Sequence, residues 1–272
     1  MKTLKDLTLL DKFLFDETME DAETFEAFLR ILLGDEELKL LSQAESEKEL
    51  RTAPWLKSIR VDVFSMDEET IYNAEMQKER RDDLIKRMRY YQALIDSSLL
   101  APGEVNYNGM KNTTIIMIMP FDMFGYGKYV YTFEGKCKEV PELKLNDGAK
   151  RIYINTRGKN VEDVTPEFVA LMNFIEYNVV KEELADSNLS RITDRVASIK
   201  ANEEVGVKFM QRWEEEIILK QTAKEEGREE GREENLLDNL HSLMQNLGLS
   251  VEQAMEALNI PKEDYPKYMS LL

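Results

Sequence analysis

Residues 59–77 constrain the fold most, because they read as two strands joined by one short polar turn. The first run, 59–66, is rich in Ile, Val and Phe and alternates in polarity, and the second run, 71–77, also alternates. Successive strand side chains point to opposite faces, so Asp62 is a charge set within a strand. A symmetric turn predicts an antiparallel hairpin with three facing pairs, Met66 with Ile71, Phe64 with Asn73 and Asp62 with Glu75.

This register opposes two carboxylates across the hairpin. Facing residues of neighbouring strands have Cβ atoms roughly 4.5–5.5 Å apart, and like charges at that separation are destabilising unless something compensates. A divalent cation bound by Asp62 and Glu75 would compensate. The alternative is a splayed or shifted hairpin in which both carboxylates face water, and the spacing leaves both interpretations open.

The same stretch and its flanks carry a family resemblance. The segments that carry it follow one another in order: L-D-K-F-L-F at 10–15, F-L-R-I-L-L-G at 28–34, D-V at 62–63, Y-N-A-E-M-Q at 72–77, K-R-M-R-Y-Y-Q at 86–92, L-I-D-S-S-L-L-A-P-G at 94–103, P-F-D-M-F-G-Y-G-K-Y-V-Y-T-F-E at 120–134 and L-N-D-G-A-K-R-I-Y-I-N-T-R-G at 145–158. On these segments the chain resembles the PD-(D/E)XK nuclease family transposases, also called the Rpn family of recombination-promoting nucleases.

The resemblance implies a restriction-endonuclease-like α/β fold, a mixed sheet flanked by helices, that hydrolyses DNA phosphodiesters with Mg²⁺. Asp62 and Glu75 would be the two motif acids and would hold the metal, with the backbone carbonyl of Met76 a candidate third ligand. Gln77 would be the third catalytic residue, where the superfamily pattern has Lys. A glutamine can orient water by hydrogen bonding but supplies no charge, so the chain departs from the pattern at this position.

Two neighbouring positions bear on the same site. Lys78 cannot replace the missing lysine, because it projects to the opposite side of the strand. Asp11 lies where the family has an acidic N-terminal motif and is a candidate auxiliary metal ligand, although Lys12 replaces the second acid of that motif. The preferred interpretation of Asp11 is an ordinary helix-start or solvated aspartate.

The composition limits which metals the chain could bind and argues against disulfides and membrane spans. Of 272 residues, one is Cys137 and one is His241, so there is neither a disulfide framework nor a Cys/His zinc site. A metal would need oxygen ligands, which favours Mg²⁺ with Mn²⁺ or Ca²⁺ as alternatives. The longest apolar run, near 115–121, is far shorter than the ~20 residues of a membrane span, so we expect a cytoplasmic protein without membrane contact.

Any contact with DNA must be local, because the formal net charge is −17. Residues 78–89 hold six basic and three acidic residues, a local excess within a predicted helix over 78–99. Arg80, Lys86 and Arg87 are the candidate DNA-binding residues, contacting phosphates. The alternative is a solvated helix face whose charges form i,i+3 and i,i+4 pairs.

The remaining elements complete an α/β pattern. We expect a helix over 22–33 closed by Gly34, a buried central strand over 113–119, further strands over 126–133 and 151–155, and a helix from Thr165 to about residue 177. Residues 38–56 read as polar and irregular.

The chain divides into three predicted parts. Residues 1–180 form the nuclease-like domain, 181–234 a charged connector with the repeat E-E-G-R, and 235–272 a small helical hairpin. The connector is expected to be a frayed, solvated helix, with a helix-packing seam as the alternative. The hairpin is too acidic to read DNA, so packing or homo-oligomerisation is preferred.

These observations predict a Mg²⁺-dependent DNA endonuclease of the transposase or recombination-promoting type. The competing hypothesis is a catalytically inactive nuclease-fold protein that acts as an interaction or oligomerisation module.

Overall fold

A computed structural model describes residues 3–41, 45–50, 59–100, 103, 105–180 and 187–272. The chain forms two compact units, Met1–Gly206 and Val207–Leu272.

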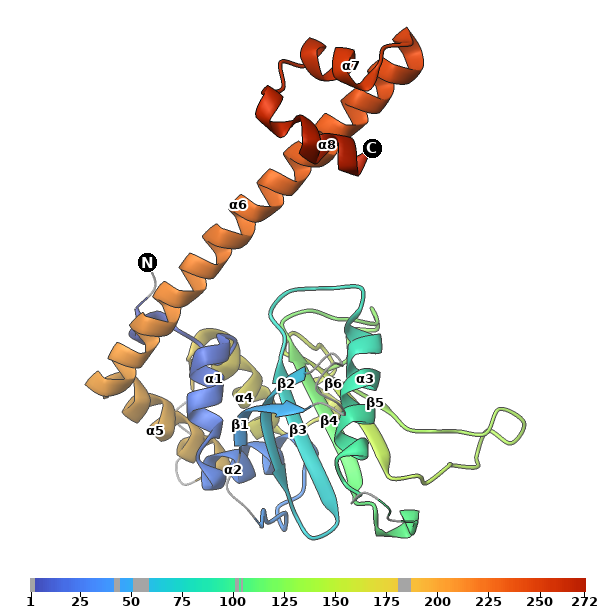
Figure 1. The fold of residues 1–272 in the computed structure, drawn as a ribbon. Coiled ribbons are helices and arrows are strands. Elements are labelled where there is room, and N and C mark those ends of the chain that lie inside the picture. Colours follow the sequence, from blue (N-terminus) through green and yellow to red (C-terminus); the bar gives the residue numbers. More distant parts are fainter. Residues whose placement is uncertain (1–2, 42–44, 51–58, 101–102, 104, 181–186) are drawn as a thin grey trace. The chain divides into compact units, whose positions relative to one another are not determined.

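The first unit is built on a mixed sheet of six strands in the order β1-β2-β3-β4-β6-β5 (Figure 1). Strands β1, β2 and β3 form an antiparallel meander, β4 and β6 run parallel to β3, and β5 is antiparallel on the edge of β6. The sheet confirms the α/β class. The strands are β1 (Glu45–Leu50), β2 (Ile59–Met66), β3 (Thr70–Met76), β4 (Asn112–Met119), β5 (Val130–Phe133) and β6 (Ala149–Asn155).

The β2–β3 hairpin has the predicted register. Met66 pairs with Ile71 and Phe64 with Asn73, and the ladder ends with Val63 and Ala74. The turn is held by the carboxylate of Asp67, which accepts hydrogen bonds at 2.8 Å from the Glu69 amide, at 2.6 Å from the Thr70 amide and at 2.7 Å from the Tyr72 hydroxyl. An aspartate that binds nearby backbone amides in this way favours a tight turn.

Helices cover both faces of the sheet (Figure 1). Helix α3 (Leu84–Ser97) packs on one face, where its apolar stripe joins one core cluster with alternate residues of β4. The other face is covered by α1 (Lys12–Met19), α2 (Ala22–Leu33) and α4 (Pro166–Tyr177), and α5 (Asn188–Ala201) packs against α2 and α1. β4 is buried almost throughout and lies between β3 and β6, so the prediction of a buried central strand is confirmed.

Local capping explains where two predicted helices begin and end. Asp21 accepts a hydrogen bond from the Thr24 amide at the start of α2, and Gly34 ends that helix with a φ of 67°. Thr165 caps α4 and precedes Pro166 at its first position. Short 3₁₀ turns lie at Leu4–Asp6, Tyr107–Gly109, Val161–Asp163 and Lys262–Asp264.

Three local predictions were wrong. The helix expected from residue 78 begins at Leu84, and the strand expected over 126–133 is only Val130–Phe133. That strand is shortened because the preceding loop wraps around Asp122, whose carboxylate accepts three backbone amides and the Tyr131 hydroxyl. The polar strand β1 lies within the segment expected to be irregular; at a sheet edge, backbone pairing with β2 forms a strand without an apolar sequence pattern.

The first unit extends to Gly206 rather than ending at residue 180. Helix α5 belongs to it, because four apolar side chains of this helix are buried: Leu189, Ile192, Val196 and Ile199. The charged stretch that follows is not frayed, since α6 (Glu203–Leu247) remains helical through Gly227 and Gly231. Its many Glu, Lys and Arg residues are good helix formers that offset a cost of about 1 kcal/mol for each glycine.

The second unit has a small core of its own. Leu240 of α6 packs with Ala254 and Met255 of α7 (Val251–Ala257) and with Ile260, and α8 (Tyr265–Leu271) closes this cluster. Ser250 and Gln253 form a capping box at the start of α7. The helical hairpin is therefore present.

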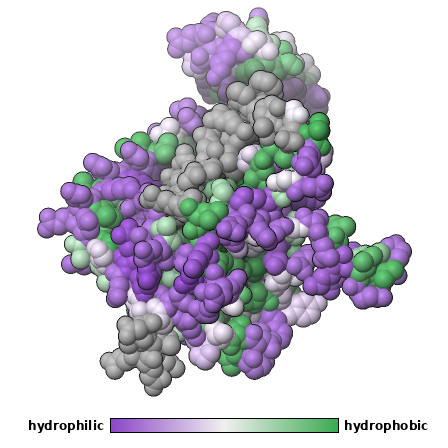
Figure 2. Space-filling view, turned by 90° about the horizontal axis from the view of Figure 1, so that it is seen from below, coloured by the Kyte–Doolittle hydropathy of each residue, from purple (hydrophilic) through white to green (hydrophobic). Residues whose placement is uncertain are grey.

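Most of the surface shown in Figure 2 is hydrophilic, with small separate hydrophobic patches. In the part of the chain that the structure describes, no helix combines the length and the apolar composition that crossing a bilayer requires.

The boundary at Gly206 gives a testable prediction. A chain of residues 1–206 should melt cooperatively, whereas a chain of residues 1–180 should melt at least 10 °C lower or aggregate, because losing α5 uncovers its apolar contacts, worth about 1.5–3 kcal/mol for each buried side chain. Thermal melts followed by circular dichroism compare the two. Equal melting temperatures would place the boundary at residue 180 after all.

Candidate active site

Asp62 and Glu75 lie together at the end of the hairpin opposite the turn, and both are buried, at 4% and 1% exposure. Beyond the last paired residues, Val63 and Ala74, the side chains of Asp62 and Glu75 form the hydrogen bonds between the two strands. The Asp62 amide donates to Glu75 Oε1 at 2.9 Å, and the Met76 amide donates to Asp62 Oδ2 at 3.0 Å. Each carboxylate therefore binds a backbone donor of the neighbouring strand, and the splayed, water-facing arrangement does not occur.

Two cationic side chains from helices contact this acid pair. Lys12, at the start of α1, donates to Asp62 Oδ1 and also pairs with the buried Asp16 at 3.2 Å. Arg87 of α3 pairs with Glu75 Oε2 at 3.2 Å. Burial alone would lower the pKa of Lys12, but the carboxylates of Asp62 and Asp16 raise it above its ordinary value, so the ammonium stays charged.

Arg87 also fixes the position of Gln77. Its Nη1 donates to Gln77 Oε1 at 2.9 Å, and its Nε donates to the Tyr91 hydroxyl at 2.8 Å, with the guanidinium 5.0 Å from the centroid of the Tyr91 ring. Gln77 Nε2 donates in turn to the Glu79 carbonyl at 2.6 Å. The amide of Gln77 is thus held next to Glu75, as the sequence predicted, by a residue that the sequence had assigned to DNA.

Burial and the neighbouring Asp62 raise the pKa of Glu75 to about 8, although the Asp62 amide, Arg87 and Lys12 act in the opposite direction. The pKa of Glu75 is raised because a carboxylate removed from water beside a like charge is costly to ionise. Glu75 therefore takes up a proton more readily than an exposed glutamate when no metal is bound.

The oxygen chemistry of the site fits a hard divalent cation such as Mg²⁺. Besides the two carboxylates, the buried Asn73 donates to Glu75 Oε1 at 3.3 Å, and its own Oδ1 has no hydrogen-bond partner within the described residues. The structure does not add a third acid: among the described residues, no three His, Cys, Asp or Glu side chains gather where they could hold a metal. The Met76 carbonyl as a ligand stays a prediction.

Asp11 is not brought together with the acid pair as a metal-binding group. Its carboxylate accepts from the Thr8 amide at 3.1 Å and from Lys78 Nζ at 3.0 Å, at the start of α1. Asp11 is the residue that precedes α1, but its side chain makes no capping hydrogen bond to that helix. Lys78 projects away from Gln77 toward Asp11, so it does not supply the missing charge either.

The three candidate DNA-binding residues have different surroundings. Arg87 points inward, toward Glu75, Gln77 and Tyr91. Arg80 is exposed and donates to the Asp122 carbonyl at 3.4 Å, and Lys86 is exposed on α3. Arg80 and Lys86 therefore remain the surface candidates.

The sequence analysis missed the roles of Lys12, Asn73 and Tyr91. For Tyr91 a signal existed, because it shares one helical stripe with Leu84 and with Arg87 four residues earlier. No local pattern predicts Lys12, since it lies 50 residues before its partner Asp62.

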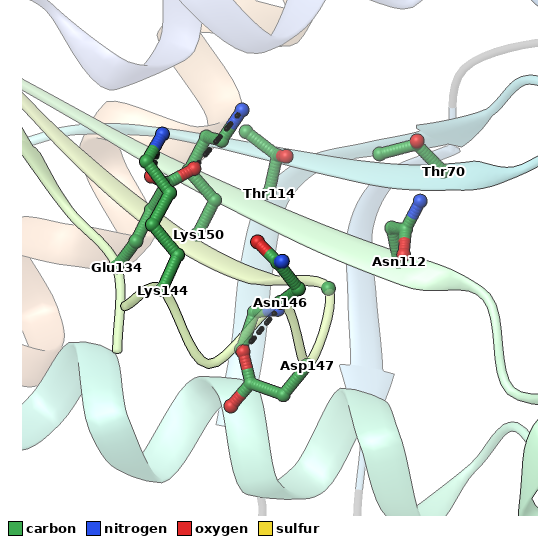
Figure 3. Close-up of a pocket in the computed structure, with 10 residues that line it drawn as sticks. Thr70, Asn112, Thr114, Glu134, Lys144, Asn146, Asp147 and Lys150 are labelled. Carbon is green, nitrogen blue, oxygen red and sulfur yellow. Dashed lines mark hydrogen bonds and ion pairs between the residues drawn. The ribbon is translucent and has the colours of Figure 1, made fainter. Parts of the chain in front are cut away.

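A hollow lies at the opposite ends of the parallel strands from the acid pair (Figure 3). It measures about 280 Å³ and is lined by the first residues of β3, β4 and β6 and by a loop. Glu134 pairs there with Lys144 and with Lys150, each at 3.7 Å. None of the predicted site residues lines it.

Comparisons of the chain with models of protein families, with curated proteins and with solved structures find no match. The function must therefore be argued from the chain's own geometry.

Proposed function

We propose that the unit Met1–Gly206 is a metal-dependent DNA endonuclease with a restriction-endonuclease-like fold, of the transposase or recombination-promoting type. The observation that carries the proposal is the buried Asp62–Glu75 pair, joined across β2 and β3 with Gln77 at the end of β3. The order of elements supports it: helices α1 and α2, the meander β1-β2-β3, helix α3, and then β4 parallel to β3.

Each residue of the site has a separate role in phosphodiester hydrolysis. Asp62 and Glu75 would hold Mg²⁺, which when bound lowers the pKa of water and offsets charge on the phosphate. Arg87 orients Gln77, so that the amide of Gln77 can hydrogen-bond to an attacking water next to Glu75. Tyr91 and Glu75 keep the Arg87 guanidinium in one place.

DNA contact would come from the exposed basic residues near this site. Replacing Arg80 and Lys86 together with Ala should lower the slope of log affinity against log salt by about 0.9 for each lost phosphate contact on duplex DNA. Fluorescence anisotropy with a labelled duplex in Ca²⁺, over a series of salt concentrations, measures the slope. An unchanged slope would make Arg80 and Lys86 a solvated surface only.

A plasmid-nicking assay tests the proposed function. Supercoiled plasmid should be nicked by the full chain in Mg²⁺ or Mn²⁺ and left intact in EDTA. The same ions should raise the melting temperature, because they bind the folded state preferentially. A chain that shows neither nicking nor a metal-induced shift would overturn the nuclease proposal.

That outcome would favour the second candidate, a catalytically inactive nuclease-fold protein used for interaction or oligomerisation. One observation supports this candidate: Lys12 pairs with Asp62 and Arg87 pairs with Glu75, so each acid has a cationic partner within the chain. Sedimentation of the full chain over a range of concentrations would then be the informative measurement.

A further inference from the structure

The two cations at the acid pair are held in different ways. Arg87 is fixed by hydrogen bonds to Tyr91, Gln77 and Glu75, and its side chain is 28% exposed. Lys12 reaches Asp62 and Asp16 with the tip of a flexible side chain that is 39% exposed. An ammonium on a four-carbon stem can exchange partners, whereas a planar guanidinium with its donors already engaged cannot do so without breaking the site.

Hydrolysis of a phosphodiester creates a need for positive charge. The water oxygen forms a new bond to phosphorus, one bond from phosphorus to a sugar oxygen breaks, and the leaving oxygen takes up a proton. Negative charge grows on the phosphate oxygens in the transition state, and fixed positive groups lower its energy. Gln77 is neutral and cannot provide that charge.

We infer that Lys12 supplies to the scissile phosphate the positive charge that Gln77 cannot. This inference rests on the proposed nuclease function. Lys12 pairs with Asp62 and Asp16; if Asp62 held a cation, the Lys12 ammonium could turn from Asp62 toward the phosphate. Lys12 keeps its own protons throughout and acts through its charge.

Exchanging the charge between the two positions tests the inference. Lys12→Met should nick plasmid about 100-fold to 1000-fold more slowly than wild type at saturating Mn²⁺, the usual loss when one group that stabilises transition-state charge is removed. The Mn²⁺-induced rise in melting temperature should be at least as large as in wild type, because a cation that competes for Asp62 is gone. The double variant with Lys12→Met and Gln77→Lys should nick plasmid at least tenfold faster than Lys12→Met alone.

A matched control is Lys5→Met, an exposed lysine of the same N-terminal segment, which should nick and melt like wild type. Lys12→Met that nicks at the wild-type rate would overturn the inference and leave the nuclease proposal standing. Lys12→Met that folds but loses the Mn²⁺ shift together with cleavage would make Lys12 a structural support of the acid pair. A wild type with neither nicking nor a shift refutes the proposed function itself.

If Lys12→Met does not melt cooperatively, Lys12→Arg decides the question. It keeps the charge, so cleavage should stay within tenfold of wild type. A 100-fold loss in a normally folded Lys12→Arg protein would overturn the inference.

Discussion

Glu75→Gln is expected to reduce metal-dependent nicking by about 100-fold or more, because one of two carboxylates that would hold the metal is lost and each 1.4 kcal/mol of lost transition-state stabilisation slows a reaction tenfold. The same change should remove the rise in melting temperature that Mn²⁺ gives the wild type. Glu79→Gln, an exposed glutamate two residues past the strand, is the matched control and should change neither. Retained nicking in Glu75→Gln would exclude this glutamate from the metal site.

The same variant should change how stability depends on pH in EDTA. The pKa of Glu75 in the folded protein, about 8, lies above its ordinary value of 4.5, so the folded state binds more protons between these limits. The contribution of Glu75 is fully present below pH 4.5 and is lost as pH rises through 8, at up to about 1.4 kcal/mol per pH unit. Glutamine does not titrate.

The titration of Glu75 determines whether wild type or Glu75→Gln has the larger free energy of unfolding at a given pH. Near pH 5, wild type and Glu75→Gln should have similar free energies of unfolding, whereas near pH 9 the variant should be the more stable of the two. Urea unfolding at several pH values, with EDTA throughout, measures the difference. A difference that does not change with pH would show that Glu75 titrates at an ordinary pKa.

Arg87→Met is expected to destabilise the protein by about 2–3 kcal/mol near pH 9, because it leaves the buried Glu75 charge without its cation. The melting temperature should fall by roughly 5–10 °C in a unit of this size. At pH 6 the loss should be smaller, since Glu75 can take up a proton instead. Gln77 should also lose its fixed orientation, and nicking should slow.

Two comparisons isolate this effect. Arg89→Met changes an exposed arginine of the same helix and should leave the melting temperature within about 2 °C of wild type. In a double-mutant cycle, Arg87→Met should cost much less in the Glu75→Gln background, because no charge is then left uncompensated. Additive effects of the two changes would show that Arg87 stabilises α3 by packing rather than by pairing with Glu75.

Local patterns were sufficient to predict the hairpin. The alternation of β2 and β3 and the polar turn between them determine which residues face each other, and the pairing of Phe64 with Asn73 was predicted correctly. The same alternation brought Asp62 toward Glu75. Gly34 likewise predicted where α2 ends, and Thr165 predicted where α4 begins.

Contacts between distant parts of the chain could not be predicted in this way. Sequence spacing suggested either a divalent cation between Asp62 and Glu75 or a splayed hairpin, but it did not predict that Lys12 and Arg87 pair with these two acids. Lys12 arrives from α1 through tertiary packing, and strand periodicity carries no information about that. Arg87 was assigned to DNA because its helix is basic, yet its place one turn from Leu84 and from Tyr91 directs it inward.

The Asp67 turn limits how this chain could change by insertion or deletion. Because side chains alternate along a strand, one residue added between Met66 and Thr70 would rotate Glu75 to the opposite side of the sheet while β3 could still pair with β4. Such a chain would lose its acid pair and would also take Ile71 out of the core cluster that it shares with α3 and β4. The length of the turn is therefore constrained by the acid pair and by the core together, whereas the exposed loop between β5 and β6 could lengthen at little cost to either.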